Sequence, residues 1–209
     1  VFIPYLPGSS LRDTIAATRR VVEFGRQAVP HLPARCFKNK RELSSWLSQI
    51  RDTGTSQLLL IAGDSLTPQG PFASTLDIME SGLIEFYGFR TIYVAGHPEG
   101  CPDITDDNIR QALAWKNAFA ERTGAELYVV TQFCFDSYSI ITWEEKIRTN
   151  IGGLPIHVGV PGLSSITGLV KYARICGIGP SVRFLTHGLD RLVKLGKTWT
   201  PAQLLTELG

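Results

Sequence analysis

Two polar positions follow apolar segments directly and could do chemistry there. Asp64 comes after Gly63 at the end of the run "LLLIAG", and Gln132 closes the segment "ELYVVTQ". Glycine lets a flat ligand approach the backbone closely, and a neutral amide can read paired donors and acceptors on a heterocycle. A purely structural role is equally compatible with the sequence. Asp64 would then cap the following loop, and Gln132 would hold a loop by a hydrogen bond.

Other motifs give weaker indications of a catalytic or binding role. His97-Pro98-Glu99 has the composition of a turn, and Lys116 lies on a predicted helix face where a lysine is usually solvated. The chain has no G-x-G-x-x-G after a strand, no phosphate-binding P-loop and no G-x-S-x-G nucleophile elbow. The histidines lack metal-ligand spacing, so no metal is expected; they are His31, His97, His157 and His187.

Charge and cysteine usage exclude several classes of protein. The net charge is +2 and no basic block exceeds two consecutive residues, so no nucleic-acid partner is expected. The longest apolar run, Leu58–Ala62, is far shorter than the roughly 20 residues of a membrane span. The four cysteines form no C-x-x-C pair. We expect reduced thiols in a cytoplasmic protein, and a homo-oligomer is compatible with the sequence.

Short apolar segments recur about every 30 residues, the length of one β-loop-α unit. Nearly every residue in them is apolar, which is typical of strands that are covered on both faces. The predicted strands are Val1–Leu6, Ala28–Leu32, Gln57–Ala62, Thr91–Ala95, Glu126–Gln132 and Ile156–Val160.

Helical patterns separate these strands. Ser10 with Asp13 resembles a capping box, and Gly25 is the expected end of that helix. Asn39 starts a second helix that ends at Gly54. Further helices are predicted at about 73–87, 107–122 and 165–176, and a last one starts near Pro201.

Helical crossovers between apolar strands indicate a parallel sheet, either open and doubly wound or closed as a (β/α)8 TIM barrel. An open sheet concentrates its chemistry at one switch point. Here loops rich in Gly, Pro and polar residues follow all six strands, which favours the barrel. We predict a single barrel domain over residues 1–209, with the first and the eighth strand outside this chain.

The strings "LLLIAGD", "VAGHPEGCPD", "VVTQFCFD" and "GVPGLSS" stand in this order along the chain. In this order and spacing they resemble the methylenetetrahydrofolate reductase family, and the resemblance covers nearly the whole chain. It implies a barrel that binds FAD and reduces 5,10-methylenetetrahydrofolate to 5-methyltetrahydrofolate. NADH or NADPH reduces the flavin and leaves, and the folate substrate then takes its place.

The resemblance also assigns roles to individual residues. Asp64 would act catalytically, because its charge tunes the flavin and favours the cationic iminium form of the substrate. Gln132 would hydrogen-bond the pterin, and Tyr172 would stack on nicotinamide or folate. His97 stands where many members carry a tyrosine. The residues implied to bind FAD are His31, Gly63, Asp64, His97 and Lys116.

One departure from the family leaves alternatives open. The family's general acid is a glutamate on the first strand, and this chain resembles the family from the second strand onward. A positioned acid contributes roughly 10²–10⁴-fold to a rate. A partner enzyme that oxidises or demethylates folates is therefore an alternative, as is a non-catalytic binding module.

Overall fold

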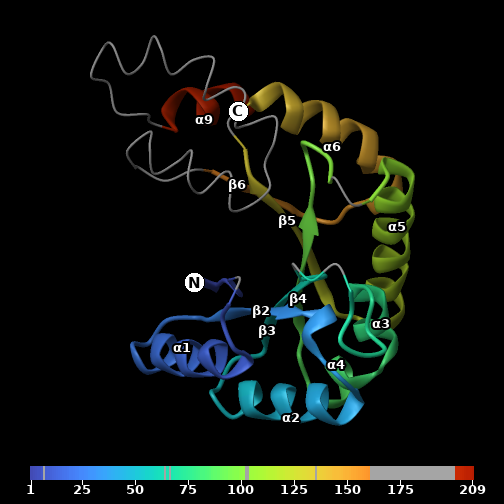
Figure 1. The fold of residues 1–209 in the computed structure, drawn as a ribbon. Helices are drawn as coiled ribbons and strands as arrows, with labels where there is room; N and C mark the ends of the chain where they lie inside the picture. Colours follow the sequence, from blue (N-terminus) through green and yellow to red (C-terminus); the bar gives the residue numbers. More distant parts are fainter. Residues whose placement is uncertain (7, 64, 66, 102–103, 135, 161–200) are drawn as a thin grey trace. The chain divides into compact units, whose positions relative to one another are not determined.

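The structure of the protein is a computed structural model (Figure 1). It describes residues 1–6, 8–63, 65, 67–101, 104–134, 136–160 and 201–209. The contacts within the chain cluster in two compact units. Residues 1–95 and 118–128 form the first, and residues 96–117 and 129–209 the second. Each unit is described by itself, and the single domain over residues 1–209 stays a prediction.

All six predicted strands are present. They form one sheet in the order β1-β2-β3-β4-β5-β6, and the pairs β1–β2, β2–β3, β3–β4 and β5–β6 are parallel. This order contains no reversal, so the described strands have no switch point of a doubly wound sheet. The predicted (β/α)8 class is confirmed over six consecutive parallel strands, and helices separate them. The strands are β1 (Phe2–Ile3), β2 (Val29–Pro33), β3 (Gln57–Ile61), β4 (Thr91–Gly96), β5 (Glu126–Phe133) and β6 (Ile156–Gly159).

The helices begin where the sequence provides caps. Ser10 and Asp13 form a complete capping box, and the Asn39 side chain accepts a hydrogen bond from the Glu42 amide. The helices are α1 (Leu11–Glu23), the 3-10 turn η1 (Ala34–Cys36), α2 (Lys40–Arg51), α3 (Thr75–Glu80), α4 (Leu83–Phe86), α5 (Asp106–Thr123), α6 (Ser137–Ile151) and α9 (Ala202–Leu208).

One helix prediction was wrong, and one helix was missed. The single helix expected at about 73–87 is divided into α3 and α4, because Gly82 between them has a φ of 71°, outside the right-handed helical region. Helix α6 was not predicted, although Asp136 caps it by accepting hydrogen bonds from two backbone amides. The helix predicted at 165–176 lies outside the described residues.

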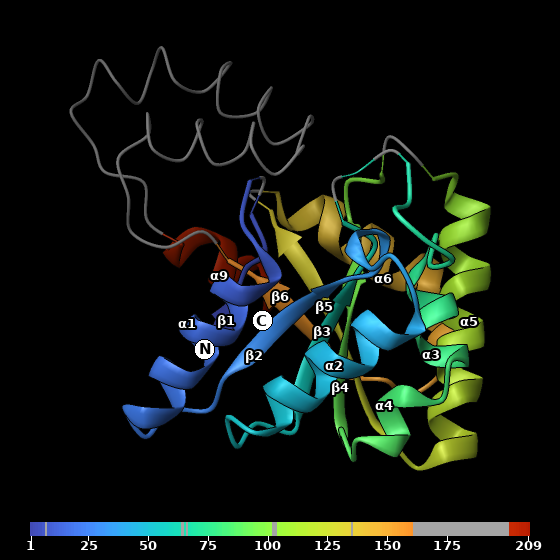
Figure 2. The same cartoon turned by 60° about the horizontal axis from the view of Figure 1, so that its bottom comes forward.

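In the first unit, the register of the strands defines two faces. His31 of β2 is opposite Leu59 of β3, which is opposite Tyr93 of β4, so these three side chains share one face. Leu58 and Leu60 point to the other face and are fully buried. Helix α1 contacts β1, β2 and α2 (Figure 2).

The prediction that every strand is covered on both faces was wrong for β4 and β5. Buried residues alternate with half-buried ones along β4, where Ile92, Val94 and Gly96 are buried. The same alternation runs along most of β5. One face of these strands is therefore packed, while the other is partly open to ligands or water.

The second unit has its own small core. Cys134, Ile140 and Leu204 are buried together, with Val158 and Val160 packed against them. This cluster joins α6 to α9, and it forms next to the carboxyl end of β5. No helix within the described ranges is long and apolar enough to cross a membrane.

Candidate active site

In the first unit, Gly63 lies just beyond β3 in a conformation that favours glycine. Its φ is 94°, and an added Cβ atom would lie 3.2 Å from Cβ of Pro33 on β2. His31 lies two residues before Pro33 on the same strand. His31 thus lies on β2 and Gly63 just beyond the neighbouring strand β3, where a side chain at position 63 would be strained by this φ and would crowd Pro33.

The loop after Gly63 is held by Arg35, a residue that the sequence did not single out. The Arg35 guanidinium donates to the backbone oxygens of Ser65, at 3.1 Å, and Ala73, at 2.9 Å. The Gln69 amide in turn donates to the Arg35 oxygen at 2.9 Å. Asp64 itself lies outside the described residues, but the residues on both sides of it belong to this braced loop.

His31 is held in its neutral form. Burial without a compensating charge lowers the pKa of His31 to about 4. A neutral imidazole can donate from one nitrogen and accept at the other. Such a group can therefore hydrogen-bond an uncharged heterocycle without adding charge next to it.

The lowered pKa of His31 predicts acid sensitivity. The unfolded chain binds a proton at this histidine near pH 6.5, whereas the folded chain does so only near pH 4. The free energy of unfolding therefore decreases as the pH falls from about 6.5 to about 4. Between pH 7 and pH 4.5, urea unfolding should show that the wild type loses about 2 kcal/mol more than His31→Gln. Replacing the exposed His157 with Gln is the control and should keep the wild-type loss. An unchanged pH dependence in His31→Gln would contradict this assignment.

In the second unit, the end of β4 is closely packed around Gly96. A Cβ atom at Gly96 would lie 2.7 Å from Cη2 of Trp143 on α6 and 2.9 Å from Cγ1 of Val129 on β5. The Trp143 side chain is buried, and its Nε1 atom has no hydrogen-bond partner in the described part of the chain. Trp143 was missed by the sequence analysis because its helix was missed.

His97 follows Gly96 directly. Its Nδ1 atom is buried and, among the described residues, has no hydrogen-bond partner. Burial lowers the pKa of His97, and the positive charge of Lys116 lowers it further. A buried imidazole nitrogen without a partner is costly, and a bound ligand that hydrogen-bonds it would remove that cost.

Lys116 is buried, with 7% of its surface exposed. It belongs to the stripe of buried positions on α5, together with Ile109, Leu113 and Phe119. No carboxylate of the described residues forms an ion pair with it, and burial lowers the pKa of Lys116 to about 8. The interpretation of Lys116 as a solvated surface lysine was wrong, since its spacing from Leu113 and Phe119 places it on the apolar face.

Gln132 lies near the carboxyl end of β5 and is exposed. Its Oε1 atom accepts a hydrogen bond from the backbone amide of Phe133 at 3.2 Å. The amide nitrogen can still donate to a ligand. Both of its sequence-based roles, pterin recognition and loop support, therefore stay predictions.

A buried thiol links two loops of the second unit. Cys134 donates from its Sγ atom to Oε1 of Glu99 at 3.0 Å. This contact joins the loop after β5 to the loop after β4, which also carries His97. Cys36 and Cys101 are free thiols.

The structure groups the predicted residues by unit. His31 and Gly63 lie together in the first unit, while His97, Lys116 and Gln132 belong to the second. His97 and Lys116 are close enough for their charges to interact. Tyr172, like Asp64, lies outside the described residues. Within the described part of the chain, no cluster of His, Cys, Asp or Glu could hold a metal ion.

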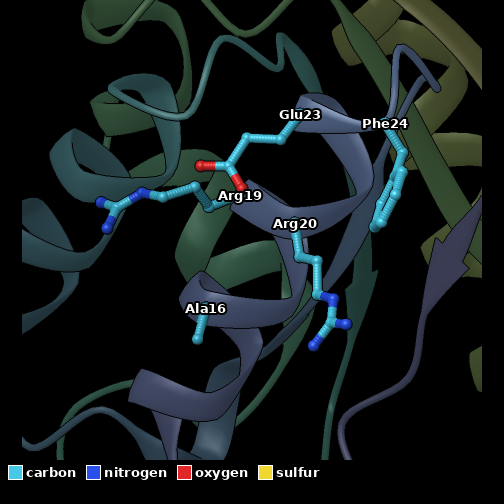
Figure 3. A pocket seen from close by; sticks show the side chains of 5 residues that line it. All are labelled: Ala16, Arg19, Arg20, Glu23 and Phe24. Atoms are coloured by element: carbon cyan, nitrogen blue, oxygen red, sulfur yellow. The ribbon is translucent and has the colours of Figure 1, made fainter.

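A surface hollow elsewhere contains none of these residues. It lies over one side of α1, where Arg19 and Arg20 extend away from each other and Phe24 lines its edge (Figure 3). Arg19, Arg20 and Phe24 are exposed side chains of one helix and its end. An open helix surface of this kind does not exclude water, so we assign it no chemistry.

Known proteins resemble this chain over most of its length. Residues 5–195 match the family model described as methylenetetrahydrofolate reductase. Methylenetetrahydrofolate reductase (NADH) 1 of Arabidopsis thaliana is 26% identical over 144 residues, which are 62% of this chain and 24% of that protein. Methylenetetrahydrofolate reductase 1 of Schizosaccharomyces pombe is 25% identical over 153 residues, 70% of this chain and 24% of that protein. The chain thus spans about a quarter of the length of these relatives.

A solved structure with a similar arrangement is the deoxyribose phosphate aldolase of Aeropyrum pernix. It has a TM-score of 0.46 and 13% sequence identity, and the match covers 88% of this chain and 70% of the aldolase. At this level of similarity the aldolase says nothing about the reaction of this chain.

Proposed function

This chain belongs to the methylenetetrahydrofolate reductase family, and we propose that it forms part of a flavin-dependent active site. The reaction would be the reduction of 5,10-methylenetetrahydrofolate to 5-methyltetrahydrofolate, with NADH or NADPH as the reductant. The observation that carries this proposal is the family match, which extends over residues 5–195 of 209.

The described residues fit FAD as a ligand. Lys116 offers a buried positive charge with no ion-pair partner among the described residues, which suits an anionic diphosphate. His97 offers a buried Nδ1 atom with no partner among them. Gly63 keeps the backbone free of a side chain after β3, which suits a flat ring. When bound, FAD supplies the hydride carrier between nicotinamide and folate.

Some residues of this chain would then bind the cofactor or the substrate, and Asp64 would act through its charge. Lys116 and His97 would hold the cofactor, and for His31 a contact with FAD is what the family resemblance implies. Asp64 would place a negative charge beside the reacting folate and so favour its cationic iminium form. The Gln132 amide would donate to the pterin.

Binding of the cofactor is the first test of this proposal. Titration of the purified protein with FAD should give a saturable change in the flavin absorption spectrum. The complex should oxidise NADH or NADPH with menadione as the electron acceptor, and the ratio of the two rates gives the preferred nicotinamide. A protein that binds no FAD and shows no such oxidation would contradict the proposed function.

A further inference from the structure

The ammonium group of Lys116 lies in an environment that does not favour a charge. Lys116 lies on the same face of α5 as the buried apolar residues Ile109 and Leu113, and only 7% of its own surface is exposed. Transfer of a charged group from water into such surroundings is costly unless a partner compensates it. The charge state of Lys116 therefore depends on what binds next to it.

No ion pair with a described residue supplies that compensation. On α5 itself, Asp107 pairs with Arg110, and Asp106, Glu121 and Arg122 are exposed. At the end of β4, Glu99 accepts a hydrogen bond from Cys134. On α6, Glu144 pairs with Arg148.

His97 is a titratable neighbour of Lys116. Its interaction with Lys116 is repulsive, since each positive charge disfavours the other. An anionic ligand is therefore the group that would stabilise the protonated amine.

We propose that the binding of the FAD diphosphate takes up a proton at Lys116, so that the chain binds its cofactor more weakly at alkaline pH. This inference rests on the proposed function, which makes FAD the ligand. In the free chain, burial lowers the pKa of Lys116 to about 8. A nearby diphosphate favours the charged form and raises this pKa.

The sign of the pH effect follows from this difference. Well below pH 8 the amine is protonated in both states, and binding involves no proton. At pH 8 about half of the free chain must gain a proton to bind, and at higher pH nearly all of it must. The affinity for FAD should be constant up to about pH 7 and fall about tenfold per pH unit above pH 8.

Titration calorimetry with FAD measures this proton directly. In two buffers with different ionisation enthalpies, the apparent binding enthalpies should agree at pH 6.5 and differ at pH 8.0. The difference should correspond to an uptake of about half a proton per FAD. The matched control is Lys116→Arg, because arginine stays protonated throughout this range. This variant should bind FAD with no proton uptake at pH 8.0. Lys116→Met, which cannot carry the charge, should bind more weakly and without dependence on pH between 6.5 and 9.

The outcomes separate the inference from the function on which it rests. Equal enthalpies in both buffers at pH 8.0, with FAD bound, would overturn the inference and leave the proposed function standing. Wild-type proton uptake by Lys116→Arg would also overturn it, because the proton would then bind elsewhere. A failure to bind FAD at any pH would overturn the proposed function and the inference together.

Discussion

Replacement of Asp64 with Asn is expected to slow the reduction of folate about 10²-fold, the usual cost of removing one electrostatic contact to a developing charge. Asn keeps the size and the hydrogen-bonding capacity of Asp but removes its charge. The proposed role of the charge is to favour the cationic iminium form of methylenetetrahydrofolate. Reduction of the bound flavin by the nicotinamide involves no such cation, so its rate should change by less than about threefold.

Anaerobic stopped-flow measurements separate these two half-reactions. The loss of flavin absorbance on mixing with NADH or NADPH reports the first, and its return on mixing with methylenetetrahydrofolate reports the second. Asp52→Asn, a change at the exposed end of α2, is the control and should alter neither rate. Equal losses of both rates in Asp64→Asn would contradict an electrostatic role toward folate.

Replacement of Gly96 with Ala should destabilise the protein by about 3 kcal/mol, the upper end of the usual cost of overpacking. The added methyl group would lie 2.7 Å from the Trp143 ring and 2.9 Å from Val129. Both neighbours are buried, so neither can move away without disturbing the core. His97 is the next residue along the chain, and a shift of the backbone there should also weaken FAD binding.

Denaturant unfolding tests the effect on stability. The control is Gly153→Ala, because no atom lies within 4 Å of its added methyl group and its φ is not in the left-handed region. That variant should stay within about 0.5 kcal/mol of the wild type. If the clash with Val129 and Trp143 is the cause, Val129→Ala should restore part of the lost stability in the Gly96→Ala background. A Gly96→Ala protein as stable as the control would show that Gly96 is not packed against Trp143 and Val129 as described.

The strands could be predicted because each is a short apolar run with clear boundaries. Helix α6 could not be predicted with the same ease, because its first two turns contain the β-branched residues Ile140, Ile141 and Thr142, which lower helix propensity. The spacing of its buried residues Ile140, Trp143, Ile147 and Ile151 is nevertheless helical, and it is the signal that could have predicted α6. Packing against the rest of the second unit overrides the weak local preference.

Part of the candidate site was also visible in the sequence. Gly63 and Gln132 could be found because they stand at the ends of apolar strands. The burial of Lys116 could have been found from its spacing on α5, but a lysine on an apolar stripe is unusual enough that solvation was the simpler interpretation. The hydrogen bonds of the Arg35 guanidinium could not be predicted, because their backbone acceptors are 30 and 38 residues away from Arg35 in the sequence.

The most direct test of the account is a single turnover with folate. The purified protein is loaded with FAD, reduced by NADH or NADPH without oxygen, freed of nicotinamide and mixed with 5,10-methylenetetrahydrofolate. The oxidised flavin spectrum should return, and one equivalent of 5-methyltetrahydrofolate should form per flavin. A reduced flavin that stays reduced in the presence of this folate, with no methyl product, would contradict the account.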